Sequence, residues 1–333
     1  FKSTDGGQNF VAAGLAGADR IARVRIDPRN GQRVFVAVQG PLYTPGGMRG
    51  VYRTEDGGQS WRPVLQGSGE WTGAIDVIFD PRDSQVMYAA MWERSRRPWN
   101  FVESGPGSGV YKSTDGGTTW TRLEGFPQGA EIGRIGLTIS AAAPDRVYAS
   151  IDNQAPLPPE LIELGDSPLS PARLKTMSKE EFLKVDPEEV ELLVRYSDFE
   201  PSLDGKALIE KVRKDEFTLD QLRARLRDGN AALFDTDIRG LDIWRSDDAG
   251  GTWRRMNQEP IREFTYTYGY YFGEIKAAPD QADRLYVLGV PQAVSEDGGA
   301  TWSGTLNDPA VHVDHHAWTF DPANPQRIFN GND

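Results

Sequence analysis

The fold is decided by the stretch Ser113-Thr114-Asp115-Gly116-Gly117-Thr118-Thr119-Trp120, which is one of five copies of the same short motif. The shared pattern is Ser/Thr-x-Asp-x-Gly-x-x-Trp/Phe, and five copies in one chain are too many for chance. Internal repeats of this kind determine the architecture, so they are considered before any other feature. The aspartates of the motif are Asp5, Asp56, Asp115, Asp248 and Asp297.

The motif has the chemistry of a tight turn between two strands. An aspartate side chain accepts hydrogen bonds from backbone N–H groups just ahead of it, and a serine or threonine hydroxyl adds a second local bond. Glycine supplies the positive φ angles that other residues resist. The aromatic residue then enters the next strand and packs in the core. We therefore interpret the five aspartates as structural, because a catalytic group is needed once and not in every repeat.

A second repeat lies between the turns. It consists of an apolar strand, a proline-bearing turn and another apolar strand, as in Ile75–Pro81 followed by Val86–Ala90. A third strand precedes the motif and a fourth follows its aromatic residue. The motif aspartates are 51 residues apart from Asp5 to Asp56 and 49 apart from Asp248 to Asp297. Four antiparallel strands in a repeat of this length predict a β-propeller blade.

These residues resemble a known family. The turns resemble the Asp-box, or bacterial neuraminidase repeat, and the chain resembles the sortilin-like, glycosyl hydrolase-like propellers of long secreted bacterial proteins. The most specific stretches are 73–93, 107–112 and 314–333. The resemblance implies an all-β propeller of four-stranded Asp-box blades, with about five blades' worth here in a ring of six to eight. It also implies that the chain is incomplete at both ends. The architecture hosts sialidases, xyloglucanases, peptide receptors and assembly factors, so it does not specify an activity.

Residues 155–235 interrupt the repeat and predict a small α-helical insertion, with blades at 1–154 and 236–333. The segment opens rich in proline. Helix signals follow: capping boxes at Ser178/Glu181 and Thr218/Gln221, and proline after Asp186 at a first helical position. We expect the last helix to end at Gly229. The predicted apolar faces comprise Leu208, Ile209 and Val212, and Leu219, Leu222 and Leu226. Two interpretations stay open: a surface decoration, or a lid or docking platform.

Composition narrows the function classes. The 333 residues carry a formal net charge of -12, which argues against binding nucleic acid or an anionic membrane. No run of 18 apolar residues occurs, so no transmembrane segment is expected. The chain has no cysteine, which excludes disulfides, thiolate metal sites and a cysteine nucleophile. Neutral ligands, cations, sugars and proteins remain as possible binding partners. With the resemblance, we expect a secreted, periplasmic or cell-surface protein.

A site is predicted on one face of the propeller. Strand direction alternates within a blade, so the long connections 39–49, 92–108 and 155–235 all emerge on the face opposite the motif turns. Propellers bind ligands at such loop-rich mouths, because loops carry function on a rigid scaffold. The pattern places these residues there as ligand-binding candidates: Asp76, Trp92, Glu93, Arg94, Trp99, Arg134, Tyr270, Tyr271, Glu274, Asp314, His315 and His316.

The histidines suggest a second possibility. All three lie in 312–316, and His312, Asp314 and His316 would share one face of a strand. Such a set could hold a divalent ion, or it could be a hydrogen-bonded polar cluster. The spacing matches no specific metal motif, so we predict no metal and no cofactor.

The predicted function is a non-catalytic binding or scaffold propeller that engages a protein or glycan partner at its loop-rich face, as a subunit of a larger extracellular or envelope assembly. Arg94, Arg96 and Arg97 stand between Trp92 and Trp99, and Trp and Arg are enriched at binding hot spots. These arginines could instead pair internally with nearby acidic residues, namely Glu93, Glu103 or those of the insertion.

The alternative function is a sialidase- or xyloglucanase-like glycoside hydrolase. Such an enzyme needs two carboxylates across a cleft. The candidate carboxylates at the mouth are Asp76, Glu93, Asp152, Glu274 and Asp314. A sialidase would add an arginine triad, with Arg94 and Arg134 as candidates, and a tyrosine nucleophile at Tyr270 or Tyr271. No firm carboxylate pair emerges from the sequence, so we assign no catalytic residue.

Overall fold

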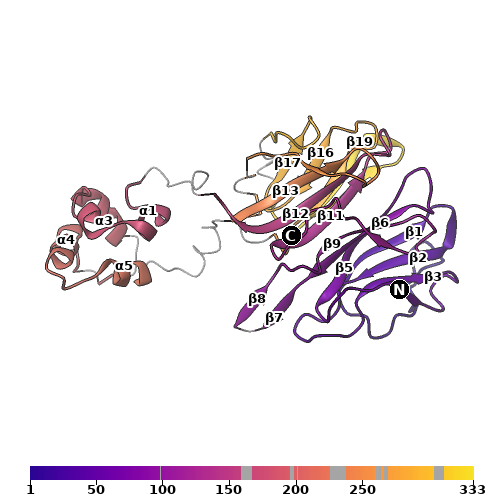
Figure 1. Ribbon diagram of the computed structural model, residues 1–333, viewed down its shortest axis with the longest axis horizontal. Coiled ribbons are helices and arrows are strands. Elements are labelled where there is room, and N and C mark those ends of the chain that lie inside the picture. The colour runs from indigo at the N-terminus through magenta and orange to yellow at the C-terminus, as the bar shows by residue number, and fades with distance from the viewer. Residues whose placement is uncertain are drawn as a thin grey trace. The chain divides into compact units, whose positions relative to one another are not determined.

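The chain folds into two compact units in this computed structural model. The first unit combines Phe1–Ala155 with Arg239–Asp333, and the second is Pro156–Ile238. Figure 1 shows the strands of the first unit and the helices of the second. The structure describes residues 1–97, 99–158, 167–195, 199–200, 202–225, 238–259, 261, 264–265, 269–303 and 311–333.

The first unit consists of strands. Those before the helical unit are β1 (Ile21–Asp27), β2 (Asn30–Val38), β3 (Gly50–Thr54), β4 (Arg62–Leu65), β5 (Thr72–Phe79), β6 (Met87–Glu93), β7 (Ser95–Arg97), β8 (Asn100–Val102), β9 (Gly109–Ser113), β10 (Thr121–Arg122), β11 (Ile132–Ile139) and β12 (Val147–Pro156). Those after it are β13 (Ile238–Ser246), β14 (Arg254–Arg255), β15 (Glu274–Ala277), β16 (Leu285–Leu288), β17 (Gln292–Ser295), β18 (His315–Asp321) and β19 (Asn324–Asn332).

The strands form successive antiparallel sheets in a propeller-like arrangement. The orders are β1-β2-β3-β4, β10-β9-β6-β5, β11-β12-β13-β14 and β15-β16-β17, and each sheet uses strands in chain order. Two hairpins, β18-β19 and β7-β8, complete the set. The prediction of an all-β propeller is confirmed at this level, with four antiparallel sheets. The blade number and the membership of the Asp-box family stay predictions.

The repeated turns show why the motif has its residue types. In the turn after β9, the Ser113 hydroxyl accepts from the Gly117 N–H at 2.9 Å and donates to Asp115 Oδ1 at 2.8 Å. Asp115 also accepts from the N–H groups of Thr118 and Thr119. Gly117 has a φ of 76°, in the left-handed region that favours glycine. These bonds, led by the one from Thr119, lower the pKa of Asp115 to about 2. The carboxylate of Asp115 is therefore engaged in hydrogen bonds within the turn.

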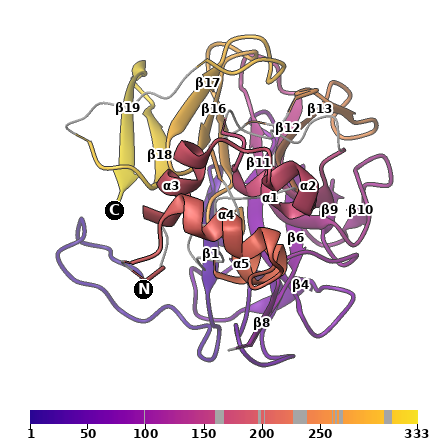
Figure 2. The same ribbon diagram turned by 90° about the vertical axis from the view of Figure 1, so that its left-hand side faces the viewer.

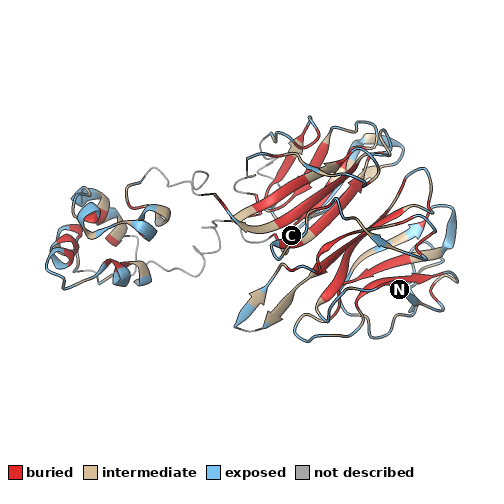
Figure 3. Cartoon of the chain, viewed as in Figure 1, coloured by how far each residue is buried: buried red, intermediate tan, exposed pale blue. Residues whose placement is uncertain are grey.

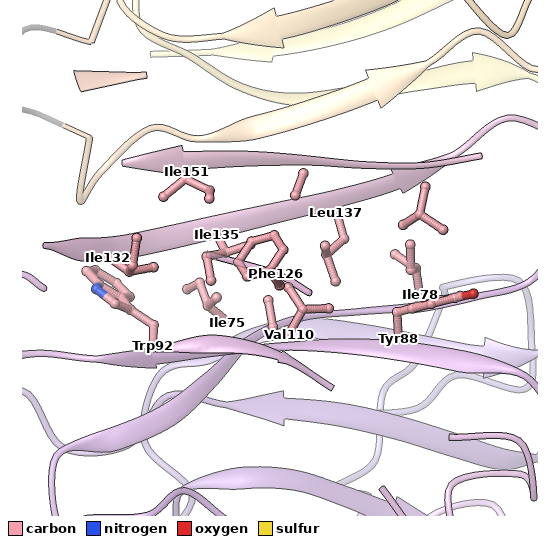
Figure 4. Packing of buried hydrophobic residues seen from close by; sticks show 13 residues of the cluster. Ile75, Ile78, Tyr88, Trp92, Val110, Phe126, Ile132, Ile135, Leu137 and Ile151 are labelled. Atoms are coloured by element: carbon pink, nitrogen blue, oxygen red, sulfur yellow. The ribbon is translucent and has the colours of Figure 1, made fainter. Parts of the chain in front are cut away.

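The core lies between neighbouring sheets. In Figure 4, Ile75, Tyr88 and Trp92 from β5 and β6 face Leu137 and Ile151 from β11 and β12. Strand β6 is buried along nearly its whole length, so it reads as an almost continuous apolar run, Met87–Glu93. Figure 3 shows this burial along the central strands and exposure at their turns.

The second unit has its own apolar core. Its helices are α1 (Pro171–Thr176), α2 (Lys179–Phe182), α3 (Pro187–Arg195), α4 (Gly205–Arg213) and α5 (Leu219–Arg225); Figure 2 shows them gathered together. The predicted capping boxes form at Ser178/Glu181 and Thr218/Gln221. Phe182, Leu208 and Leu222 are fully buried and belong to a single apolar cluster. The predicted helix end at Gly229 and the face position Leu226 lie outside the described residues.

We expect Ser113→Ala to lower the free energy of unfolding by about 1–3 kcal/mol, because it leaves the buried Gly117 N–H without an acceptor. Chemical denaturation followed by tryptophan fluorescence measures this. Ser68→Ala is the matched control, since Ser68 is exposed. Equal stability of the two variants would show that the hydroxyl does not hold the turn.

We expect the first unit to keep its strands when Pro156–Ile238 is replaced by a short glycine-serine linker. The second unit connects β12 to β13 along the chain. These two strands are neighbours in one sheet, so a short linker can replace the unit. The β-type far-UV circular dichroism should remain after the helical contribution is lost. Loss of all folded signal would show instead that the helices are part of the propeller core.

Candidate binding site at the loop-rich face

A two-stranded ribbon stands at the end of β6. Strands β7 and β8 pair antiparallel, with Arg96 opposite Phe101, and form a sheet of their own that projects from the sheet of β5, β6, β9 and β10 (Figure 1). Trp99 lies at the turn and is 78% exposed. An indole this exposed contributes nothing to the core, so it is available for contact with another molecule.

Arg94 directly precedes β7, and its side chain lies over the ring of Trp92. Its guanidinium lies 4.4 Å from the centre of the Trp92 ring, and the Trp92 indole N–H donates to the Glu103 carbonyl at 2.7 Å. The Nε of Arg94 is buried and has no hydrogen-bond partner among the described residues. Burial, followed by the like charges of Arg134 and other arginines, lowers the pKa of Arg94 to about 9. Arg94 forms no ion pair with a described residue.

The other arginines around Arg94 are held by carbonyl groups and rings. Arg134 on β11 donates to the backbone carbonyls of Tyr270 and Tyr271. Arg49 donates to four loop carbonyls, and Arg96 lies over the Phe101 ring at 5.1 Å. In the described part of the chain no ion pair forms at any of these arginines: Arg49, Arg94, Arg96, Arg97 and Arg134. The internal pairing of Arg94, Arg96 and Arg97 that the sequence left open with Glu93 or Glu103 is thus not found there.

Two buried carboxyl groups interact with each other: Glu103, directly after β8, and Asp152. Asp152 on β12 is 4% exposed, and one oxygen of each of Glu103 and Asp152 is buried with no hydrogen-bond partner among the described residues. Burial, and next the carboxyl of Asp152, raises the pKa of Glu103 to about 8. Burial raises the pKa of Asp152 to about 7, against the opposing hydrogen bond from Gln154 and the charge of Arg134. Glu103 is therefore mostly neutral at pH 7, whereas Asp152 is near the midpoint of its titration there.

The inner strands carry a compensated charge network. Asp76 on β5 accepts from Arg23 at 3.0 Å and from the Leu137 N–H at 3.1 Å. Arg23 also pairs with Glu274 at 3.0 Å, and Lys276 pairs with Glu274 at 2.7 Å. Burial acts to raise the pKa of Asp76, but the charge of Arg23 and its neighbours outweighs burial and lowers it. Asp76 and Glu274 are thus both paired with cations: Arg23 of β1 pairs with both, and Lys276 of β15 pairs with Glu274 on its own strand.

The remaining candidates divide between the ribbon and the last hairpin. Glu93 accepts from the Gly107 N–H at 2.7 Å, which fastens the end of the loop. Tyr270 packs edge-to-face on Phe101, with ring centres 4.7 Å apart. Tyr271 is 52% exposed and contacts the His316 ring instead, at 4.8 Å.

The histidine segment differs from the sequence-based expectation. Strand β18 begins at His315, so His312 and Asp314 precede it and do not share a strand face with His316. His315 is buried between Gln292 and Asn330, and burial lowers its pKa. The backbone turns at Asp314, where φ is 68° and ends the extended conformation that the shared face requires. Among the described residues no group of three side chains is placed to hold a metal ion.

The structure thus separates the predicted site residues into three groups. Trp92, Arg94, Arg134 and Tyr270 lie around the ribbon with Trp99 and Glu93; Asp76 and Glu274 join the inner network; Tyr271, Asp314, His315 and His316 belong to the last hairpin. Sequence reasoning missed Arg23 and Phe101 as parts of these groups. Arg23 carried a signal, because it stands four residues before Asp27-Pro28, as Asp76 stands four residues before Asp80-Pro81.

Comparison with known proteins yields structural similarity alone. No protein-family model matches the chain, and no curated protein matches it. A GH74 enzyme of Niastella koreensis is 17% identical with a TM-score of 0.47, over 92% of this chain and 34% of that one. The GH74 xyloglucanase of Xanthomonas campestris is 15% identical with a TM-score of 0.46, over 95% and 35%. YCF48 bound to D1 peptide is 12% identical with a TM-score of 0.41, over 96% and 62%.

The chain spans about a third of the length of the two GH74 proteins. At these identities and TM-scores the matches do not define what this chain does. In the described part of the chain, no helix has both the length and the apolar character required to cross a membrane.

Proposed function

We propose that the chain is a non-catalytic binding propeller that engages a protein or glycan partner at its loop-rich face, through the β7–β8 ribbon. The observation that carries this proposal is the ribbon itself: an exposed Trp99 beside Arg96 and Arg97, which have no ion pair among the described residues. Arginine and tryptophan are the residue types that dominate binding energy at protein interfaces.

The state of the inner-strand carboxylates supports binding over catalysis. A glycoside hydrolase needs one carboxyl to donate a proton and a second, ionised one to attack or to activate water. Asp76 and Glu274 are both engaged by cations, Arg23 for both and Lys276 for Glu274. Despite burial, the charge of Arg23 lowers the pKa of Asp76, which is the opposite of the raised pKa of a general acid.

A second candidate function rests on a different observation. Glu103 and Asp152 both have raised pKa values, about 8 and about 7, and a raised pKa is the property of a glycosidase general acid. A glycoside hydrolase that uses this pair is therefore the alternative. Both pKa values are raised, so neither group is the carboxylate of ordinary low pKa that serves as nucleophile or base.

The two functions are separated by the double change Arg94→Ala with Arg97→Ala. Pull-down from the native source and hydrolysis of a glycan panel are measured on the same preparations. We expect loss of partner binding and no hydrolysis even by the unmodified protein. Hydrolysis by the unmodified protein that disappears in Asp152→Asn would overturn the proposal. Arg62→Ala with Arg255→Ala is the control, since it removes the same charge from outer strands.

We infer from the resemblance that the blades, at 1–154 and 236–333, are of the Asp-box type and belong to a ring of six to eight, with 155–235 as an insertion. The same resemblance supports a location outside the cytoplasm, within a larger envelope or extracellular assembly. Cell fractionation with an antibody to the chain tests the location, and recovery in the cytosolic fraction would contradict it.

A further inference from the structure

The β7–β8 ribbon has free strand edges. It pairs with no other strand of the described chain, so the outer edges of Ser95–Arg97 and Asn100–Val102 both present backbone N–H and C=O groups without a partner strand. Free edges are templates for the addition of another extended chain, and native proteins usually cover or shorten them. Here the edge is short, but it stands outside the blades and carries the exposed side chains of Trp99 and Val102.

The positive charge of the ribbon indicates what kind of partner chain it could bind. Arg96 and Arg97 lie on β7, where adjacent side chains point to opposite faces, and Arg94 directly precedes the strand. None of the three forms an ion pair in the described part of the chain, although the protein as a whole has a net charge of -12. A partner chain that supplies carboxylates would match these three arginines in charge.

We propose that the ribbon binds an extended acidic peptide segment of a partner protein, which adds as a third strand while Arg94 receives one of its carboxylates. This rests on the proposed binding function and names the chemistry of the partner. Strand addition uses the backbone of the partner, which a glycan does not have; the free edge therefore favours a peptide. Trp99 and Val102 supply apolar contact for the residues between the carboxylates.

The position of Arg94 is set before the partner arrives. Stacking on Trp92 fixes the plane of the guanidinium, and the Trp92 indole is itself tethered to the Glu103 carbonyl. A planar guanidinium held in this way presents a fork that fits a carboxylate with little further loss of side-chain entropy. Arg134 adds a second positive charge nearby.

The probe is a short, terminally blocked peptide that alternates glutamate with valine, and its binding to the full chain is measured by fluorescence polarisation. Comparison peptides have glutamine for glutamate, or N-methyl groups on alternate amides. We expect the acidic peptide to bind and both comparison peptides to bind at least about tenfold more weakly, since each loses charge-assisted or backbone hydrogen bonds. Oligogalacturonate supplies carboxylates without a peptide backbone, and we expect weaker binding for it.

We expect Arg94→Gln to weaken binding of the acidic peptide about tenfold or more, and Arg97→Gln, at an exposed position, to weaken it by a smaller factor. Arg62→Gln is the matched control and should leave binding unchanged. Because Arg94 is partly buried, thermal unfolding of each variant confirms that it is folded. No binding of the acidic peptide, equal binding of the glutamine peptide, or stronger binding of oligogalacturonate would overturn the inference. If the inference fails while pull-down of the native partner still depends on Trp99, the proposed function stands.

Discussion

Asp76→Ala is expected to lower the free energy of unfolding by about 3–5 kcal/mol, the largest stability effect among the substitutions considered. Asp76 is buried, and its carboxylate joins three strands: it pairs with Arg23 from β1, and it accepts the Leu137 N–H from β11 and the Val77 N–H from its own strand. Removal leaves buried donors unsatisfied and Arg23 with one carboxylate instead of two. The expected cost is therefore that of breaking a buried ion pair, which greatly exceeds the value of an exposed one.

The control for this effect is Glu296→Ala. Glu296 pairs with Arg284 at 2.9 Å, but it is exposed, so its removal should cost about 0–1 kcal/mol. Urea denaturation of both variants gives the comparison. An Asp76→Ala variant as stable as Glu296→Ala would show that the inner network does not hold the sheets together.

We expect the unmodified chain to lose stability at alkaline pH, and we expect Glu103→Gln to prevent this loss. The folded chain holds Glu103 at a pKa of about 8, above the ordinary value of 4.5, chiefly by burial and next by the carboxyl of Asp152. A raised pKa means that the folded state binds the proton more tightly than the unfolded state. The stabilisation is therefore complete below about pH 4.5 and is lost as the pH rises through 8. Asp152 adds to the same trend, with loss around pH 7.

Thermal or denaturant unfolding between pH 5 and pH 9 tests this effect. At the alkaline end, Glu103→Gln should be more stable than the unmodified chain by roughly 2–4 kcal/mol, with little difference at the acidic end. Glu70→Gln, at an exposed position, should follow the unmodified chain throughout. Parallel pH profiles of the unmodified chain and Glu103→Gln would show that the carboxyl is ionised in the folded state.

Local chemistry explains which parts of the fold were predictable. The turn at Asp115 is specified by neighbours within four residues, so its hydrogen bonds follow from the motif alone. The capping box at Ser178 is local for the same reason. The ion pairs of Arg23 with Asp76 and Glu274 join residues that are far apart in the chain, and they depend on how the strands assemble around one another. No local pattern specifies those partners.

The candidate site shows the same division. The aromatic and basic composition of the ribbon was evident from the sequence. Trp99 is exposed, and its role in binding stays a prediction. The raised pKa of Glu103 was not predictable, because it arises from burial against Asp152 on a later strand. The proposed shared face of His312, Asp314 and His316 was wrong, because the extended strand starts only at His315 and positive φ at Asp314 breaks the alternation.

The most direct measurement places a photo-crosslinking amino acid at Trp99 and identifies what it joins in the native source. The same amino acid at Phe10, an exposed aromatic position in the first motif turn, is the control. If the ribbon is a binding surface for an acidic protein segment, position 99 gives a discrete crosslinked protein, the attachment maps to an acidic stretch, and Arg94→Gln abolishes the product. Equal products at positions 10 and 99, or no product at 99 from a chain that hydrolyses glycans through Asp152, would contradict a binding function at this face.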